Sequence, residues 1–193
     1  PRAHACSAIV EDEDEDGQPE MWVMGGYGRW DDLATVEAYN PRTNEWRSCL
    51  SLRQGRQDAV AGVVGGRLVV AGGCAICADG VRRLTSVEAY SPSGWAPLPP
   101  LPHAANNATA CVLEGRLYVM GGNECNKLQV LEMSKENVFT WSVKADLPAD
   151  RSDAASVAHE GKIWLMGGTA DRVVTTSVLI YDIDADSWGT GPA

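Results

Sequence analysis

The apolar residues of this 193-residue chain fall in short runs, and one such run recurs four times directly in front of a Gly-Gly pair. The four runs occupy residues 21–24, 67–71, 116–120 and 162–166. The first glycines of the pairs are 47, 49 and 46 residues apart. Runs this short, rich in Val, Leu, Ile and aromatic residues and bounded by turn residues, predict β-strands rather than helices. Self-similarity at this period predicts a radial or solenoidal repeat.

Two aromatic markers run in phase with the glycine pairs. A tryptophan closes each repeat, and a Val-x-x-Tyr segment precedes it at residues 36–39, 87–90 and 178–181, with residues 128–133 at the same place in the third repeat. A glycine pair permits positive φ and lets a neighbouring strand pass closely, while Trp and Tyr supply apolar area between repeats. We therefore interpret all of these residues as structural and expect each indole to be buried. They are Gly25, Gly26, Gly72, Gly73, Gly121, Gly122, Gly167, Gly168, Tyr39, Tyr90, Tyr181, Trp46, Trp95, Trp141 and Trp188.

The order of these markers resembles the kelch motif: an apolar strand, Gly-Gly, a variable loop, a Val-x-x-Tyr strand, a polar turn and then Trp. The resemblance covers nearly the whole chain and implies an all-β fold, a β-propeller of four-stranded blades. We expect one domain, residues 1–193, with blades at approximately 1–52, 53–101, 102–147 and 148–193. The chain is either an unusual closed ring of four blades or part of a larger, six- or seven-bladed propeller. We favour the larger propeller, because uncovered blade faces need capping.

Three local expectations follow from this division into blades. The inner strand of the first blade is expected at residues 2–10, beside the central channel. The loop at residues 74–84 is the longest of those that follow a glycine pair, and we expect it to be irregular. The proline-rich segment 95–102 is expected to cross to the next blade rather than to serve as a polyproline ligand.

The composition is that of a soluble globular β protein, with 45% hydrophobic residues, 22% charged residues and 20 glycines. No apolar run approaches the roughly 18 residues of a membrane-spanning helix. No signal peptide is visible, and the opening at Pro1 without an initiator Met indicates a trimmed chain. The net charge is −10, of which the acidic run from Glu11 to Asp16 supplies six charges. The modest remainder and the lack of a basic patch disfavour nucleic-acid binding.

The acidic run is most simply a solvated loop, with a docking segment for a basic partner or a weak divalent-cation site as alternatives. The six cysteines differ in position from repeat to repeat, so we expect reduced thiols, in the cytoplasm or another reducing compartment. Cys74 and Cys77 have the spacing of a zinc or redox pair, but a structural zinc site needs two further ligands. We therefore expect loop cysteines, no metal and no cofactor.

Aligning the inner strands places three arginines at one repeat position beside the channel, Arg2, Arg56 and Arg151, with Ala105 in the third repeat. Two residues further on come His4, Asp58, Asn107 and Asp153. Arginines bind carboxylates in a bidentate manner, so an acidic peptide or protein loop is one predicted partner. The alternative is that they bond to backbone carbonyls and nearby aspartates and lock the blades. The loops add further candidate partner-binding residues: Tyr27, Arg29, Trp30, Arg82, Arg83, Asn123 and Arg172.

Enzymes with kelch-like propellers include sugar mutarotases, copper radical oxidases and iron-dependent specifier proteins, so catalysis is one alternative. His4, His103 and His159 are scattered, and no nucleophile with a partnered base can be assembled, so we predict no catalytic residue. Our leading hypothesis is a non-catalytic interaction module or scaffold, a subunit or adaptor in a larger complex. A substrate-recognition module of a ubiquitin ligase is a second alternative, although no BTB, BACK or F-box pattern is visible. The enzyme alternative is a mutarotase or a metal-dependent oxidase.

Overall fold

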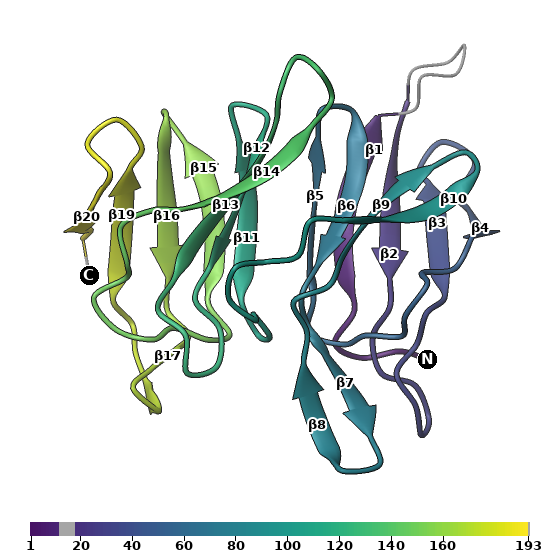
Figure 1. The fold of residues 1–193 in the computed structure, drawn as a ribbon, viewed down its shortest axis with the longest axis horizontal. Helices are drawn as coiled ribbons and strands as arrows, with labels where there is room; N and C mark the ends of the chain where they lie inside the picture. Colours follow the sequence, from purple (N-terminus) through teal and green to yellow (C-terminus); the bar gives the residue numbers. More distant parts are fainter. Residues whose placement is uncertain (12–17, 193) are drawn as a thin grey trace.

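The computed structural model describes residues 1–11 and 18–192, which contain twenty strands and no helix (Figure 1). Sixteen of the strands form four antiparallel four-stranded sheets, and the other four form two small hairpins. We call each four-stranded sheet a blade. The all-β architecture of four-stranded blades predicted from the sequence is confirmed.

Each blade is a meander in which strands that follow one another also pair. Blade one contains β1 (Cys6–Glu11), β2 (Pro19–Met24), β3 (Val36–Asn40) and β4 (Glu45–Cys49). Blade two contains β5 (Val60–Val64), β6 (Arg67–Ala71), β9 (Val87–Ser91) and β10 (Gly94–Leu98). Blade three contains β11 (Thr109–Leu113), β12 (Arg116–Met120), β13 (Leu128–Met133) and β14 (Phe139–Val143). Blade four contains β15 (Ala155–His159), β16 (Lys162–Met166), β19 (Val178–Asp182) and β20 (Ser187–Thr190).

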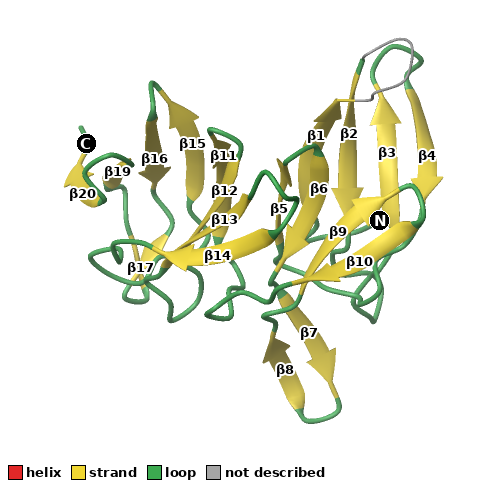
Figure 2. Cartoon of the chain, turned by 45° about the horizontal axis from the view of Figure 1, so that its top comes forward, coloured by secondary structure: helices red, strands yellow, loops and turns green. Residues whose placement is uncertain are grey.

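Three hydrophobic cores lie between consecutive blades, which stand side by side with the chain termini at opposite ends of the row (Figures 1 and 2). Trp22 and Val70 belong to the core between blades one and two, and Val69 and Leu117 belong to the core between blades two and three. A third core joins blades three and four. Because the second strand of a middle blade is covered on both faces, β6 is buried at four consecutive positions instead of alternating.

The glycine pairs and the tryptophans make the same contacts at each junction between blades. The second glycine of a pair donates its N–H to a carbonyl of the next blade, as Gly26 does to Arg56 at 2.7 Å and Gly122 to Arg151 at 2.7 Å. Each later tryptophan donates its indole N–H to the chain that enters its blade, as Trp95 does to the carbonyl of Leu50 at 2.8 Å. These repeated bonds explain why Gly-Gly and Trp recur in the sequence at a fixed phase.

Four local expectations are corrected. The first inner strand begins at Cys6 rather than at residue 2, because Ala3 is drawn into a bridge with Tyr27. Only the second half of the proline-rich segment, residues 99–102, leads toward the next blade; its first half lies in β10, the outer strand of its blade, where Pro97 is tolerated because an edge strand needs fewer N–H donors. Residues 74–84 are not irregular: they form the hairpin β7 (Cys74–Cys77) and β8 (Gly80–Arg83). A smaller hairpin, β17 (Thr169–Ala170) and β18 (Val173–Val174), occupies the same position in blade four.

The fourth correction concerns the repeated tryptophans: only Trp95 is buried, Trp141 and Trp188 are half-buried, and Trp46 is 52% exposed. Trp46 lies in blade one, and the described chain places no preceding blade against it. Only Glu11 of the acidic run belongs to the described residues, so the predictions for that run lie outside them. All six cysteines are described, and each has a free thiol.

Candidate partner-binding face

The loops that follow the four glycine pairs lie at one end of the blades, the lower edge in Figure 1. They span residues 25–35, 72–86, 121–127 and 167–177. The hairpin β7–β8 projects furthest from this edge (Figure 2). Because these loops share one edge of the packed blades, they form one surface, which we call the loop face.

A belt of four residues runs from blade to blade beside the loop face. Asp58 donates its N–H to the carbonyl of His4, Asn107 to that of Asp58 and Asp153 to that of Asn107, at 2.9 to 3.2 Å. All four residues have φ between 54° and 57°. His, Asp and Asn tolerate this left-handed conformation better than most residues, which explains their recurrence at one repeat position. Their side chains also pair, His4 Nδ1 with Asp58 Oδ1 at 2.8 Å and Asn107 Nδ2 with Asp153 Oδ1 at 2.9 Å.

The three aligned arginines bond inside their own blades. Arg56 donates to the carbonyl of Gly72 at 2.7 Å, to Ser86 and to the carboxylate of Glu88 at 2.8 Å. Arg2 repeats this pattern with Gly25, Thr35 and Glu37 in blade one, and Arg151 repeats it with Gly167 and Ser177 in blade four. Each guanidinium thus ties the start of an inner strand to the first glycine of the pair.

Burial corrects the expectation that Arg56 and Arg151 offer their side chains to a partner. Arg56 is 0% exposed and Arg151 is 5% exposed, whereas Arg2 is half-buried. Among the described residues Arg151 forms no ion pair with a carboxylate, and desolvation lowers the pKa of its guanidinium. Blade three lacks both members of the pair that Arg56 and Glu88 form in blade two. Ala105 stands at the position of the arginine, and the neutral Gln129 stands at the position of the glutamate. The alternative interpretation holds in part: these arginines bond to backbone carbonyls as expected, but they bond within their own blades and not to the nearby aspartates.

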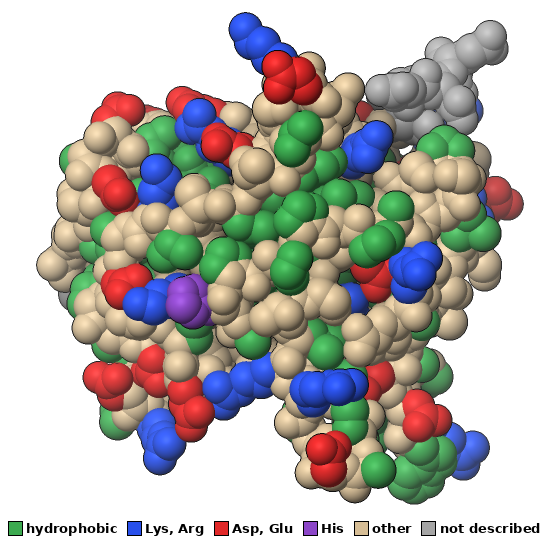
Figure 3. Space-filling model, in the orientation of Figure 1, with side chains coloured by type: hydrophobic (Ala, Val, Ile, Leu, Met, Phe, Trp, Pro, Cys, Tyr) green, Lys and Arg blue, Asp and Glu red, His purple; other side chains and the backbone are tan. Residues whose placement is uncertain are grey.

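The loops, by contrast, expose large apolar side chains at their tips. Trp30 is 77% exposed, Val81 66% and Val174 83%, and they come from the loops of blades one, two and four. Figure 3 shows hydrophobic side chains next to Lys and Arg side chains along this edge. Exposed apolar side chains on loops that share one edge of the fold give a partner protein apolar area to bury.

The structure distributes the predicted loop residues over three hollows of the loop face. Tyr27 and Arg29 line a hollow of about 570 Å³ with Arg2. Arg82 lines a second hollow of about 310 Å³, between the loops of blades one and two. The third hollow, of about 420 Å³, is lined by Arg83, Asn123 and Arg172, which the sequence places 40 and 49 residues apart. Trp30 belongs to none of these linings and projects from its loop.

One residue that the sequence did not single out, Glu124, links two of the predicted arginines. Its carboxylate accepts from Arg83 Nη2 at 2.9 Å and from Arg172 Nη2 at 3.1 Å. The hydrogen bond and charge of Arg83, followed by those of Arg172, lower the pKa of Glu124. A glutamate in a short loop carries no sequence signal for this role, because its partners lie in two other blades.

The arrangement around Cys74 argues against nucleophilic catalysis there. Cys74 Sγ lies 3.7 Å from Asp58 Oδ2, and the other oxygen of Asp58 holds His4, so the carboxylate stands between the thiol and the imidazole. Burial and the charge of Asp58 raise the pKa of the Cys74 thiol to about 11, which keeps it protonated and unreactive. The described residues contain no group of three or more His, Cys, Asp or Glu side chains arranged to hold a metal ion.

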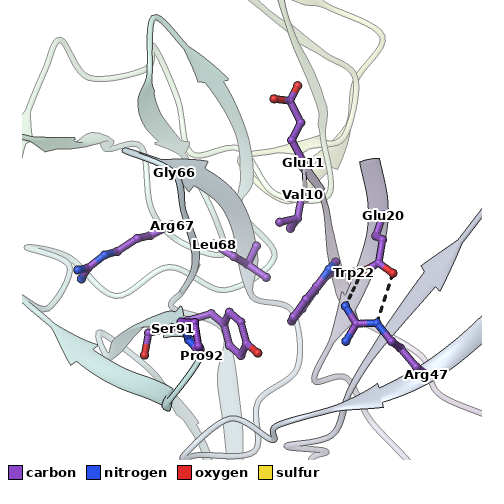
Figure 4. A pocket seen from close by; sticks show the side chains of 11 residues that line it. Val10, Glu11, Glu20, Trp22, Arg47, Gly66, Arg67, Leu68, Ser91 and Pro92 are labelled. Carbon is purple, nitrogen blue, oxygen red and sulfur yellow. Dashed lines mark hydrogen bonds and ion pairs between the residues drawn. The ribbon is translucent and has the colours of Figure 1, made fainter. Parts of the chain in front are cut away.

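A separate hollow of about 660 Å³ lies between blades one and two at the end opposite the loop face (Figure 4). Glu20, although buried, accepts from Arg47 at 2.5 Å, and the Arg47 guanidinium lies 5.3 Å from the ring centre of Trp22. Val10 and Leu68 add apolar wall. The buried carboxylate of this hollow, Glu20, is therefore already paired with Arg47 of the same blade.

Comparison with known proteins places these features in a family. The Kelch motif matches residues 18–52 and 150–192. Kelch-like protein 35 of Mus musculus is 30% identical over 88% of this chain, which corresponds to 28% of that protein. Kelch-like protein 23 of Homo sapiens is 31% identical, over 88% of this chain and 30% of the relative. Kelch repeat and BTB domain-containing protein 1 of horsepox virus is 24% identical, over 97% of this chain and 33% of the relative.

Among solved structures, YjhT superposes with a TM-score of 0.79 at 19% identity, over 100% of this chain and 66% of the YjhT chain. At this level of identity the likeness concerns the fold. The chain spans about 30% of the length of the curated relatives that it matches. No helix in the described residues has the length and apolar character needed to cross a bilayer.

Proposed function

This chain belongs to the kelch-repeat family of β-propellers, and from that premise we propose that it is a protein-interaction module that holds a partner protein on its loop face. The observation that carries the proposal is the set of apolar side chains at the loop tips, above all Trp30, Val81 and Val174. An interface over these tips would bury their apolar area and desolvate the arginines on the same loops. The exposed Arg29, Arg82, Arg83 and Arg172 make an acidic peptide or loop the matching partner.

Within this class, a subunit or scaffold in a larger assembly is the first role that we infer. It requires only a rigid surface, which the packed blades and the belt of bonded residues supply. Trp95 donates its indole N–H to the carbonyl of Leu50, at the end of the preceding blade. Trp46 is exposed, and the described chain places no preceding blade beside it. From this difference we infer a larger propeller. Six free thiols fit a reducing compartment.

The experiment is cross-linking mass spectrometry on the native full-length protein, comparing wild type with the variants Trp30→Ser and Val174→Ser. We expect both variants to lose most of the stoichiometric links to the partner. Val138→Ser is the matched control, because Val138 is also exposed but lies in a turn at the opposite end of the blades. Retained links in both loop variants, with a folded protein, would reject the loop face as the interface.

The names of the viral relatives favour a second candidate, since they join kelch repeats to a BTB domain. In that case the blades would recognise the substrate of a ubiquitin ligase. An in vitro ubiquitylation assay of the cross-linked partner with the full-length protein separates the two roles. Modification that depends on Trp30 would assign the ligase role, and stable unmodified binding would assign the scaffold.

Catalysis is the third and weakest candidate. Its best structural support is the pair of His4 and Asp58 on the belt, and this pair lacks a reactive nucleophile because the neighbouring Cys74 is kept protonated. Metal analysis of the purified full-length protein, together with an assay for sugar mutarotation, tests it. A stoichiometric metal ion or measurable turnover would overturn our preference for binding.

A further inference from the structure

The loops of blades two and four fold into hairpins, whereas the loop of blade three is short and contains no strand. The hairpins β7–β8 and β17–β18 therefore stand on either side of residues 121–127 (Figure 1). Between them lies the hollow of about 420 Å³, visible as a notch in the lower edge of the surface (Figure 3). We call this hollow the saddle. Its lining includes Arg83, Asn123, Glu124, Asp150, Thr169 and Arg172.

Three blades contribute to the ion pairs inside the saddle. Arg83 comes from the hairpin of blade two, Arg172 from that of blade four and Glu124 from the short loop of blade three. All three side chains are substantially exposed, at 40%, 84% and 57%. Exposed ion pairs of this kind contribute little to stability and exchange readily. Two arginines thus converge on a carboxylate that is held only loosely.

The other carboxylates of the saddle are already engaged by backbone or amide donors. Asp150 Oδ1 accepts the N–H of Asp171 at 2.5 Å, and Asp153 Oδ1 accepts from the amide of Asn107 at 2.9 Å. Glu124 differs from them because arginines hold it. It occupies the place that the carboxylate of a ligand would take.

The saddle is also bordered by an unpaired strand edge. On the far side of the hairpin, Ile76 donates its N–H to Asp32 of blade one at 2.5 Å, so β7 faces blade one and β8 faces the saddle. Within the described chain β8 pairs only with β7. A free edge of this kind accepts an added strand from a partner. The exposed Val81 and Val174 lie on the two hairpins that border the saddle and offer apolar contact to side chains of that strand.

We propose that the saddle is the seat of an extended peptide segment whose carboxylate side chain replaces Glu124 between Arg83 and Arg172, while its backbone pairs with β8. The inference rests on the proposed function and names the chemistry of the partner segment. It also assigns Glu124 a role: this residue forms ion pairs with both arginines in the free protein and so limits their affinity for acidic partners. Removing its charge should therefore strengthen binding rather than weaken it.

The test is an NMR titration of the ¹⁵N-labelled chain at low salt with an acetylated, amidated Thr-Val-Glu-Val-Thr peptide. We expect Glu124→Gln to bind this peptide about threefold more tightly than wild type, the size expected for one exposed ion pair. Arg172→Ala should weaken binding by a similar factor, and amide shifts should concentrate in β8 and residues 121–127. The same peptide with Gln in place of Glu should bind weakly and show no gain with Glu124→Gln.

Glu136→Gln is the matched control, because Glu136 is an exposed glutamate in the turn before β14, at the opposite end. The proposal is overturned if Glu124→Gln leaves the affinity unchanged or lower, if the shifts lie outside the saddle, or if this variant does not bind at millimolar peptide. Such a failure is distinguishable from failure of the proposed function. Partner links that still depend on Trp30 would leave the loop face standing and remove only the saddle.

Discussion

Replacing Gly121 by alanine tests whether contact between blades, beyond backbone conformation, explains the glycine pairs. Gly121 has a φ of 66°, and a Cβ atom there would lie 2.2 Å from the carbonyl oxygen of Arg151 in the next blade. Gly167 occupies the same repeat position in blade four with a φ of 63°, but its Cβ would meet only the carbonyl of Thr175 at 3.6 Å. The two glycines therefore share a conformation and differ in whether another blade lies against them.

The expected losses of stability follow from two contributions, the left-handed backbone conformation and the contact with the next blade. A left-handed backbone costs an L-residue about 1 kcal/mol, and this term applies to both variants. Forcing an extra methyl group against a packed neighbour adds about 2 kcal/mol, and this term applies only to Gly121→Ala. We therefore expect the free energy of unfolding to fall by about 3 kcal/mol for Gly121→Ala and by about 1 kcal/mol for Gly167→Ala. The difference corresponds to roughly 4–8 °C in Tm.

Urea unfolding followed by tryptophan fluorescence measures both free energies, provided that the m values stay the same. Gly66→Ala is the control for conformation alone, because Gly66 has a φ of 74° and its Cβ would have no neighbour within 4 Å. Equal losses for Gly121→Ala and Gly167→Ala would refute the reasoning. In a full-length protein whose next blade covers blade four, Gly167→Ala should lose as much as Gly121→Ala.

Three further predictions concern the repeat contacts and the saddle. Trp95→Phe should lower the free energy of unfolding by about 1 kcal/mol through loss of its indole hydrogen bond, whereas Trp46→Phe should change it little, as urea unfolding will measure. Glu88→Gln should cost about 3 kcal/mol in the same assay, because it leaves the buried Arg56 charge without its carboxylate. The carboxyl of Glu124 should titrate below the ordinary glutamate pKa in ¹³C NMR. Because its folded-state pKa is lowered, its ion pairs should persist above the ordinary value and be lost as pH falls through the lowered one.

The sequence by itself determined the repeat architecture. Short apolar runs, glycine pairs and tryptophans at a common period are local signals, and each marks a contact that recurs at every junction between blades. The bonds of Gly26, Gly122 and Trp95 show why these positions recur. The belt positions were also aligned correctly from the sequence, although their shared left-handed conformation became visible only in the structure.

The tertiary structure decided which of the candidate residues are accessible. The sequence does not show whether an arginine at a repeat position contacts solvent or a backbone carbonyl. In the structure Arg56 and Arg151 are buried and therefore not accessible to a partner. Arg83, Glu124 and Arg172 lie far apart in the sequence and meet because neighbouring blades bring their loops to one edge. The periodicity of a repeat fixes what each blade looks like, but contacts between different loops depend on the individual residues that interrupt the period. For this reason the fold could be predicted from the sequence, whereas the saddle could be found only in three dimensions.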